Sequence, residues 1–183
     1  MKIGIQGVPG SFCEVAAKQY FQADHVENIY LHNSHNVCEA LSNNLIDRGV
    51  IAVENSIGGI VEETKLALAA FPLRVLDEIE IPIVQCLMSV APIPFEQITE
   101  IHSHPQALAQ STAFIASKMP NAKVIPEEDT ALCAQHLRDG KWSNTAVMIG
   151  NAACAEIYGL RLLQEGTQNT DNNRTRCIIL ASG

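Results

Sequence analysis

Short continuous apolar runs alternate along the chain with segments in which apolar residues recur with the period of an α-helix. This pattern predicts an α/β fold. Residues 2–6 are predicted to form an apolar strand. An amphipathic helix is predicted to follow, and Ser11 and Glu14 form a capping box at its start. The same succession continues to Pro72. It predicts strands at 26–31 and 50–53, and helices at 34–48 and 60–71.

The second half of the chain repeats the strand–helix order after a long extended stretch at 73–89. A Pro-containing turn at 91–94 follows this stretch. Strands are predicted near 101, 124–125 and 146–149, with helices at 103–119, 127–138 and 151–158. We find no internal sequence repeat.

This order predicts two small α/β lobes. Lobe 1 is expected at about 1–75 plus 166–183, and lobe 2 at about 76–165. The extended stretch would carry the chain from the first lobe into the second. A cleft between two such lobes is the default expectation for a ligand site.

A polar stretch at 167–177 precedes the last apolar run, Ile178–Leu180. Its Asn, Asp and Thr side chains can hold an irregular backbone by bonding to it. It places Thr175 beside Arg176, and a hydroxyl next to a guanidinium suits a small anion. On this segment alone, a plain polar surface loop before the last strand is the favoured interpretation.

Two other strand-to-helix loops carry polar side chains. Glu54, Asn55 and Ser56 follow a buried strand, where open α/β sheets bind ligands, although Asn55 or Ser56 could simply cap the next helix. The turn from Gly7 to Ser11 could offer N–H groups to an anion, but its spacing lacks the third glycine of a dinucleotide site.

Composition narrows the choice of function. The 183 residues are 47% apolar and carry a net charge of −8, which favours a globular protein and argues against nucleic acid. No apolar run is long enough to span a bilayer, and no signal peptide is recognisable. Six cysteines without C-x-x-C spacing are expected to be reduced thiols in the cytoplasm. Apart from Glu100, no carboxylate or cysteine lies at ligand spacing from the histidines, so a metal site is not expected. No other cofactor is expected.

Five motifs in order resemble the catalytic domain of the prephenate dehydratase family, over essentially the whole chain. The motifs in this sequence are Gly7–Phe12, Val53–Val61, Ser103–Gln110, Ala155–Leu160 and Asn173–Arg176. The resemblance implies a two-lobed fold like type II periplasmic binding proteins, with the active site between the lobes, and a homodimer. It also implies decarboxylative dehydration of prephenate, a dianion, to phenylpyruvate, CO₂ and water in phenylalanine biosynthesis.

The resemblance assigns a role to Thr175, and the chemistry of the implied reaction suggests roles for the other residues. Thr175 would be the central catalytic hydroxyl, and Glu54 or Glu128 would supply the proton if buried. Substrate binding is expected from Arg176, Ser11, Asn55, Ser56, Ser103 and Gln110. An arogenate dehydratase, or a non-catalytic protein of the same fold that binds a small anion, are the alternatives.

The sequence departs from the family pattern at Cys177, where the family has Phe. If the strand is regular, Thr175 and Cys177 point to the same side, and Cys177 is expected to be a buried packing residue. Ser11 replaces a common Thr and keeps the hydroxyl. The phenylalanine-sensing ACT domain of many relatives is not contained in these 183 residues.

Overall fold

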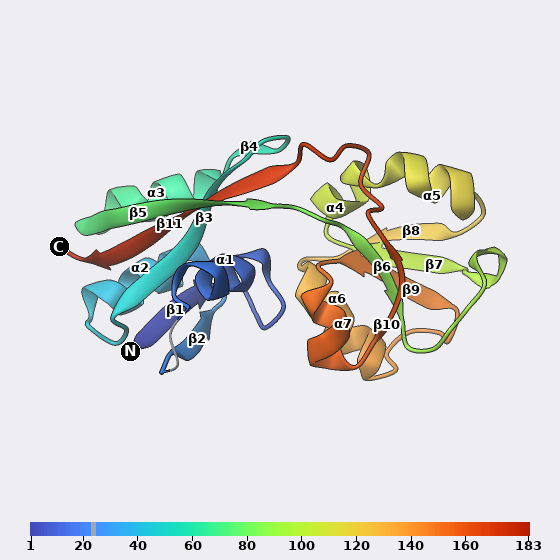
Figure 1. Cartoon of the computed structure of the whole chain (residues 1–183), viewed down its shortest axis with the longest axis horizontal. Helices are drawn as coiled ribbons and strands as arrows, with labels where there is room; N and C mark the ends of the chain where they lie inside the picture. The colour runs from blue at the N-terminus through green and yellow to red at the C-terminus, as the bar shows by residue number, and fades with distance from the viewer. Residues whose placement is uncertain (23–24) are drawn as a thin grey trace. The chain divides into compact units, whose positions relative to one another are not determined.

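The computed structural model describes residues 1–22 and 25–183, and these divide into two compact units. The first unit comprises Met1–Ile83 with Asn172–Gly183, and the second comprises Val84–Asp171. Each unit contains one sheet with helices on both faces (Figure 1), so the predicted pair of α/β lobes is present. The divisions fall later than the 75/76 and 165/166 boundaries expected from the sequence.

The position of strand β5 explains the first difference in the boundaries. The stretch expected to cross between lobes contains two strands, β5 (Leu73–Pro82) and β6 (Cys86–Ser89), in different sheets. β5 pairs along its whole length with the last strand, β11 (Arg174–Ser182). Its hydrogen bonds therefore hold it in the first unit, and the chain leaves that unit only after Ile83.

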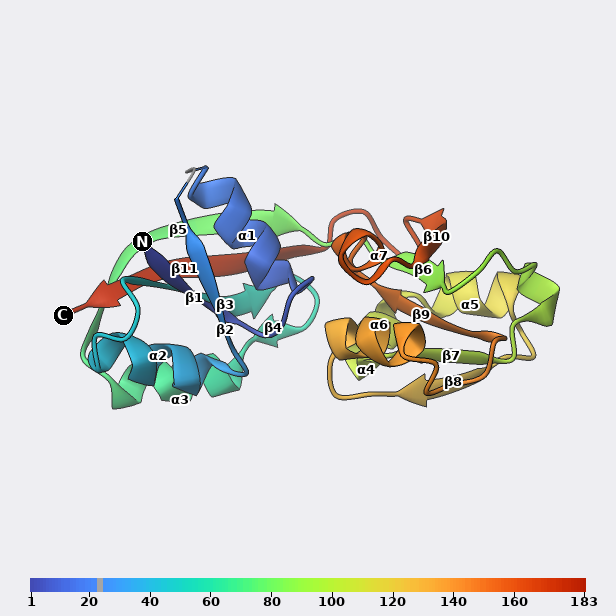
Figure 2. The same cartoon turned by 90° about the horizontal axis from the view of Figure 1, so that it is seen from below.

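The first unit has the sheet order β2-β1-β3-β11-β5, with β4 added to β3. β1, β2 and β3 are parallel, whereas β11 runs antiparallel to β3 and β5. α1 packs on one face, and α2 and α3 pack on the other (Figure 2). The other bounds in this unit are β1 Lys2–Gln6, α1 Phe12–Tyr20, β2 Glu27–Leu31, α2 Ser34–Ser42, β3 Arg48–Asn55, β4 Gly59–Ile60 and α3 Glu62–Ala70.

The second unit has the sheet order β10-β6-β9-β7-β8. β7, β8 and β9 are parallel, and β6 and β10 complete the sheet in antiparallel pairings. α4 and α5 cover one face, where Leu108 and Ile115 join a buried core with Ile101 and Ile149. The bounds are η1 Phe95–Gln97, β7 Glu100–Ser103, α4 Pro105–Gln110, α5 Thr112–Lys118, β8 Lys123–Pro126, α6 Thr130–Arg138, β9 Ala146–Gly150, α7 Ala153–Tyr158 and β10 Arg161–Glu165.

Two predicted helices are shorter than expected. α2 ends at Ser42 rather than near residue 48, because Asn44 adopts a left-handed conformation with φ 54°. The single helix expected at 103–119 is broken at Ser111 into α4 and α5. The carbonyl of Gln110 accepts a hydrogen bond from the backbone N–H of Asn169 at 2.6 Å, so it is used outside the helix.

The last strand begins earlier than the sequence suggested. β11 starts at Arg174, so Thr175 and Arg176 lie in the sheet and not in the preceding loop. Along the neighbouring β5 the register is regular from Arg174 to Ile179, and adjacent side chains therefore point to opposite faces. In the part of the chain that the structure describes, no helix has the length and apolar character needed to cross a bilayer.

Candidate functional site

A buried polar cluster lies in the first unit where strands β3 and β11 meet. Asn55 is the last residue of β3 and stands opposite Thr175 of β11. Both residues are 8% exposed. The two polar side chains predicted from separate loops are therefore neighbours across an antiparallel pair of strands.

Backbone groups fix the orientation of the Asn55 side chain. Its Oδ1 accepts hydrogen bonds from the N–H groups of Ile57 at 3.1 Å and Gly58 at 2.9 Å. Because backbone N–H groups can only donate, the other end of the amide must be Nδ2. Nδ2 donates to the carbonyl oxygen of Arg174 at 3.1 Å, to Oδ1 of Asn173 at 2.8 Å and to Oγ1 of Thr175 at 3.0 Å.

This arrangement determines what Thr175 can do. Its oxygen accepts from Asn55, and within the described residues its side chain makes no other hydrogen bond. The hydroxyl proton is therefore available to a ligand. Asn55, expected to bind substrate, has instead both ends of its amide engaged with the protein, and it positions Thr175.

Ser56 holds the same strand end together. Its hydroxyl accepts from the N–H of Arg174 at 2.9 Å and donates to the carbonyl oxygen of Asn172 at 3.2 Å. Its own N–H donates to the carbonyl oxygen of Arg174 at 2.9 Å. The Ser56 side chain is exposed, but its hydrogen bonds fasten β11 to the loop after β3.

Arg176 lies on the other face of β11 from Thr175. Its guanidinium donates to Glu54 and to Glu78, each at 2.8 Å. The hydrogen bonds that Arg176 donates, first to Glu54 and then to Glu78, raise the pKa of Arg176 above its ordinary value. The structure thus does not bring Arg176 together with Thr175, because neighbours in a strand alternate faces.

The same alternation affects the predicted proton donor Glu54. It stands opposite Arg176, and its side chain is 45% exposed. Glu54 is therefore an ion-pair partner near the surface rather than the buried acid expected next to Thr175.

Cys177 shares the face of Thr175, as the strand periodicity predicted. It is fully buried in the core formed with α1, together with Ile79 and Ile179. Cys177 is thus a packing residue of the sheet.

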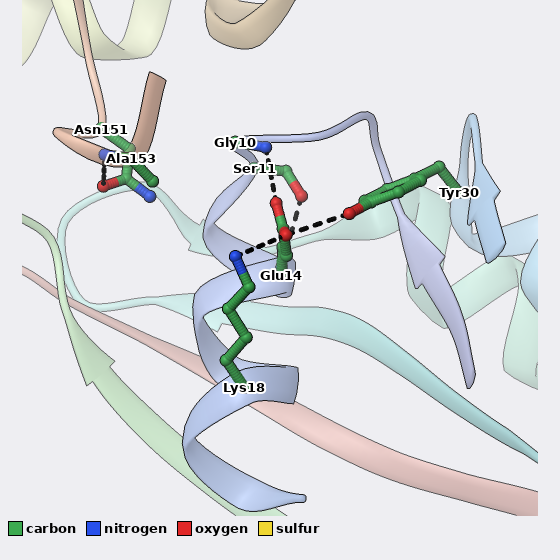
Figure 3. A network of polar contacts seen from close by, with 7 residues as sticks. All are labelled: Gly10, Ser11, Glu14, Lys18, Tyr30, Asn151 and Ala153. Carbon is green, nitrogen blue, oxygen red and sulfur yellow. Dashed lines mark hydrogen bonds and ion pairs between the residues drawn. The ribbon is translucent and has the colours of Figure 1, made fainter. Parts of the chain in front are cut away.

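Ser11 caps α1 as predicted, but the helix start is already occupied. The Ser11 hydroxyl accepts from the N–H of Glu14 at 3.3 Å, and the Glu14 carboxylate accepts from the N–H of Gly10 at 2.6 Å (Figure 3). The expected anion site at this turn therefore contains the protein's own carboxylate.

Glu14 is 4% exposed and has two further partners in its own unit. Lys18 Nζ lies 2.7 Å from Glu14 Oε1, and the Tyr30 hydroxyl donates to the same oxygen at 2.9 Å (Figure 3). Burial alone would raise the pKa of Glu14, but the bonds from Lys18, Gly10 and Tyr30 outweigh it and lower the pKa. Glu14 is thus a buried carboxylate held in its charged form.

The second unit contains a different polar cluster around the start of α5. Gln110, 6% exposed, accepts from Nε2 of Gln85 at 3.1 Å. The Ser111 hydroxyl lies 3.2 Å from that of Thr167, and the N–H of Thr167 donates to the carbonyl oxygen of Gln85 at 2.8 Å. Gln110 therefore lies in a buried network that ties α4 to residues of the polar stretch.

The Ser103 hydroxyl donates its proton within the protein. It is fully buried at the end of β7 and donates to the carbonyl oxygen of Ile149 at 2.6 Å. The residue that caps α4 is the next one, His104, whose Nδ1 accepts from the N–H of Gln106 at 3.2 Å. Ser103 was expected at this helix start, and its role is to fix β7 to β9.

Glu128 lines a shallow pocket in the second unit. The pocket has a volume of about 360 Å³ and lies at the carboxyl ends of β7 and β8. Its lining residues are His104, Pro105, Pro126, Glu127 and Glu128. Glu128 is exposed and, within the described residues, makes no hydrogen bond or ion pair.

The neighbouring Glu127 has a defined partner. Its Oε1 lies 2.9 Å from Nδ1 of the buried His102, whose ring stacks on Trp142 at 3.7 Å between centroids. Across residues 1–22 and 25–183, no group of three or more His, Cys, Asp or Glu residues is placed to hold a metal ion.

Two buried amides were not anticipated from the sequence. The Nδ2 atom of Asn173 and the Oε1 atom of Gln85 are covered from solvent and have no hydrogen-bond partner among the described residues. Asn173 lies within a motif that drew attention to Thr175, but no pattern distinguishes a buried Asn from the exposed ones around it. Gln85 lies in the extended stretch, where no motif marks it.

Comparisons with known proteins agree on one family. The family model described as prephenate dehydratase matches residues 3–183. The chain is similar to arogenate dehydratase 5 of Arabidopsis thaliana, with 33% identity over 181 residues, which are 99% of this chain and 42% of that protein. It therefore spans less than half the length of this relative.

Solved structures give the same fold. The chain is similar to prephenate dehydratase from Arthrobacter aurescens in complex with L-Phe, with a TM-score of 0.91 and 26% identity over 100% of this chain and 61% of that chain. A periplasmic substrate-binding protein from Coxiella burnetii matches with a TM-score of 0.54 and 13% identity, over 100% of this chain and 84% of that one. This second likeness concerns the fold alone, and it confirms the predicted resemblance to periplasmic binding proteins.

Proposed function

The chain belongs to the prephenate dehydratase family, and from this premise we propose that it converts prephenate to phenylpyruvate, CO₂ and water. The observation that carries the proposal is the Thr175 hydroxyl, which accepts from Asn55 and keeps its own proton free for a ligand. A hydrogen-bond donor without a protein acceptor is what a departing hydroxyl group needs.

The proposed reaction consumes one proton for each prephenate dianion. The bond from the ring to its carboxylate breaks, its electron pair enters the ring, and the ring hydroxyl leaves from the opposite carbon. With a proton this hydroxyl becomes water, and the product ring is aromatic. The enzyme must therefore hold the dianion and stabilise negative charge as it develops on the departing oxygen.

Thr175 would hydrogen-bond the departing oxygen. A threonine hydroxyl is too weak an acid to be the proton source, so a carboxylic acid is required. Of the two acids considered, we keep Glu128 as the one to test, since its carboxylate has no partner in the described chain; Glu128 is exposed, so the burial expected from the sequence is not met. Glu54 is the weaker candidate because its carboxylate pairs with Arg176.

The substrate could instead be arogenate, which carries an amino group where prephenate has a keto group. The match to an arogenate dehydratase at 33% identity favours keeping this second candidate. Comparing kcat/KM for the two substrates decides between them. A protein that binds the anion without turnover would show saturable binding and no product.

The direct test is to mix the purified chain with prephenate and follow the absorbance of phenylpyruvate. The expected result is a rate that is proportional to protein concentration and exceeds the spontaneous rate in a protein-free blank. A rate equal to the blank with prephenate would refute the proposed activity, and the absence of phenylalanine formation from arogenate would refute the second candidate as well.

We also propose that the protein functions in the cytoplasm as a homodimer. All six cysteines are buried, which is in keeping with a reducing compartment. Burial raises the pKa of the Cys38 thiol to about 11, so this thiol is protonated and unreactive near neutral pH. Light scattering coupled to size-exclusion chromatography would measure the mass in solution and test the dimer.

A further inference from the structure

The buried amide of Asn173 contains a hydrogen-bond donor that the protein does not use. Asn173 is 1% exposed, and its Nδ2 has no acceptor among the residues that the structure describes. Buried polar groups in folded proteins are almost always paired, so an unpaired donor needs an explanation.

The identity of the unpaired atom follows from a chain of fixed neighbours. The N–H groups of Ile57 and Gly58 require Oδ1 of Asn55 at one end of its amide. Nδ2 of Asn55 then donates to the Arg174 carbonyl and also to Asn173, so the Asn173 atom that faces it must be an oxygen. The remaining atom of the Asn173 amide is therefore a nitrogen that carries two protons.

This nitrogen belongs to the same cluster as the Thr175 hydroxyl. One atom, Nδ2 of Asn55, lies 2.8 Å from Oδ1 of Asn173 and 3.0 Å from Oγ1 of Thr175. Asn173 immediately precedes β11, and Thr175 is the second residue of that strand. Asn55 thus orients both side chains through their oxygen atoms, and both keep a free donor.

From this geometry we infer that Asn173 is a second catalytic hydrogen-bond donor, and that its Nδ2 and the Thr175 hydroxyl both contact the departing oxygen of the substrate. The inference rests on the proposed function and adds a residue to it. A neutral donor held away from bulk water is effective for charge that develops only in the transition state. The donor would also require no reorganisation, because Asn55 holds the amide in place.

Three variants test this inference on the intact protein. Asn173→Asp keeps the oxygen that accepts from Asn55 and replaces the donor with a second oxygen. Asn173→Ala removes the side chain's hydrogen bonds altogether. Asn43→Asp, at an exposed position after α2, introduces the same charge change as a control.

The expected result for Asn173→Asp is a fall in kcat of about 10²-fold or more, with KM within about threefold of wild type. The loss should fall on kcat because the charge on the departing oxygen exists only in the transition state. It should shrink as the pH is lowered from about 7 toward about 5, since the carboxyl group introduced by Asn173→Asp would again donate once it is protonated. Asn43→Asp should behave as wild type.

Distinct outcomes overturn the inference. A kcat for Asn173→Asp within about threefold of wild type would mean that the nitrogen serves packing or a buried water. A change in KM alone would assign it to ground-state binding instead. If Asn173→Asp does not fold, Asn173→Ala decides, and a wild-type kcat in that variant refutes the role. Failure of the proposed function itself is recognised separately, because the wild-type protein would then show no turnover.

Discussion

Asn55 and Thr175 face each other across β3 and β11, and the amide nitrogen of Asn55 donates to the Thr175 hydroxyl oxygen at 3.0 Å. The direction of this bond leaves the Thr175 proton free. Its consequences for activity and stability can be measured at both residues.

Replacing Thr175 should abolish most of the activity with little effect on folding. Thr175→Val keeps the shape and removes the hydroxyl, and kcat is expected to fall by about 10²–10³-fold, as for loss of one preorganised donor. Thr175→Ser keeps the hydroxyl and should retain most of kcat. Phenylpyruvate absorbance gives the rates, and a Thr175→Val enzyme with nearly wild-type kcat would contradict the role.

Two substitutions of Asn55 separate its effect on the orientation of the Thr175 hydroxyl from its effect on the stability of the fold. Asn55→Ala leaves the N–H groups of Ile57 and Gly58 without their acceptor, so unfolding in urea should show a loss of about 2–3 kcal/mol. Asn55→Asp keeps this acceptor but can no longer donate to Thr175. The hydroxyl proton would then turn toward the new carboxylate.

For Asn55→Asp we therefore expect a smaller loss of stability than for Asn55→Ala, together with a large loss of kcat. Equal losses of stability in the two variants would contradict the role of the Asn55 side-chain oxygen as acceptor for the N–H groups of Ile57 and Gly58. A wild-type kcat in Asn55→Asp would contradict the account of Thr175.

Arg176 should affect turnover much less than Thr175, because it points to the other face of β11. Its exposed ion pairs with Glu54 and Glu78 should contribute at most about 1 kcal/mol to the free energy of unfolding. Arg176→Met is expected to keep KM for prephenate within about threefold. Glu78→Gln, which removes one partner, is the matched control, and a large rise in KM only for Arg176→Met would restore the carboxylate contact predicted from the sequence.

Glu14 should make stability depend on acid pH. Its pKa in the folded protein lies below the ordinary value of 4.5, so the folded state favours the charged form. The stabilisation is fully present above that ordinary value and is lost as the pH falls through the lower folded pKa. Wild type should therefore exceed Glu14→Gln in stability near pH 7, by about 1–3 kcal/mol.

The difference between wild type and Glu14→Gln should narrow at about pH 3.5, and urea unfolding at both pH values measures it. The exposed Glu62, which pairs with Lys65 at 3.4 Å, is the control. Glu62→Gln should change stability by less than about 1 kcal/mol at either pH. If the difference in stability between wild type and Glu14→Gln instead becomes larger as the pH is lowered, this explanation of the role of Glu14 is contradicted.

Glu128 is tested as the proton source through the pH dependence of kcat. Glu128→Gln should lower kcat by about 10²–10⁴-fold and remove the limb of the pH profile that reports the acid. Glu127→Gln is the neighbouring control, since Glu127 bonds to His102. An unchanged profile in Glu128→Gln would exclude Glu128 from proton transfer.

Local sequence patterns were sufficient to predict the fold class. The alternation of apolar runs and helical stripes depends on local periodicity, and this was enough to predict two α/β units. The motifs also drew attention to Asn55 and Thr175, which stand opposite each other in the sheet. Cys177 was correctly placed on the face of Thr175, since strand alternation is a local property.

The direction in which the side chains of Asn55, Thr175 and Arg176 act depends on contacts between distant parts of the chain. The start of β11 at Arg174 depends on pairing with β3 and β5, which are distant in the sequence, and this pairing separates Arg176 from Thr175. The direction of each hydrogen bond around Asn55 follows from backbone N–H groups that no side-chain pattern reveals. The free donor of Asn173 exists for the same reason: whether a buried amide is satisfied depends on every group around it.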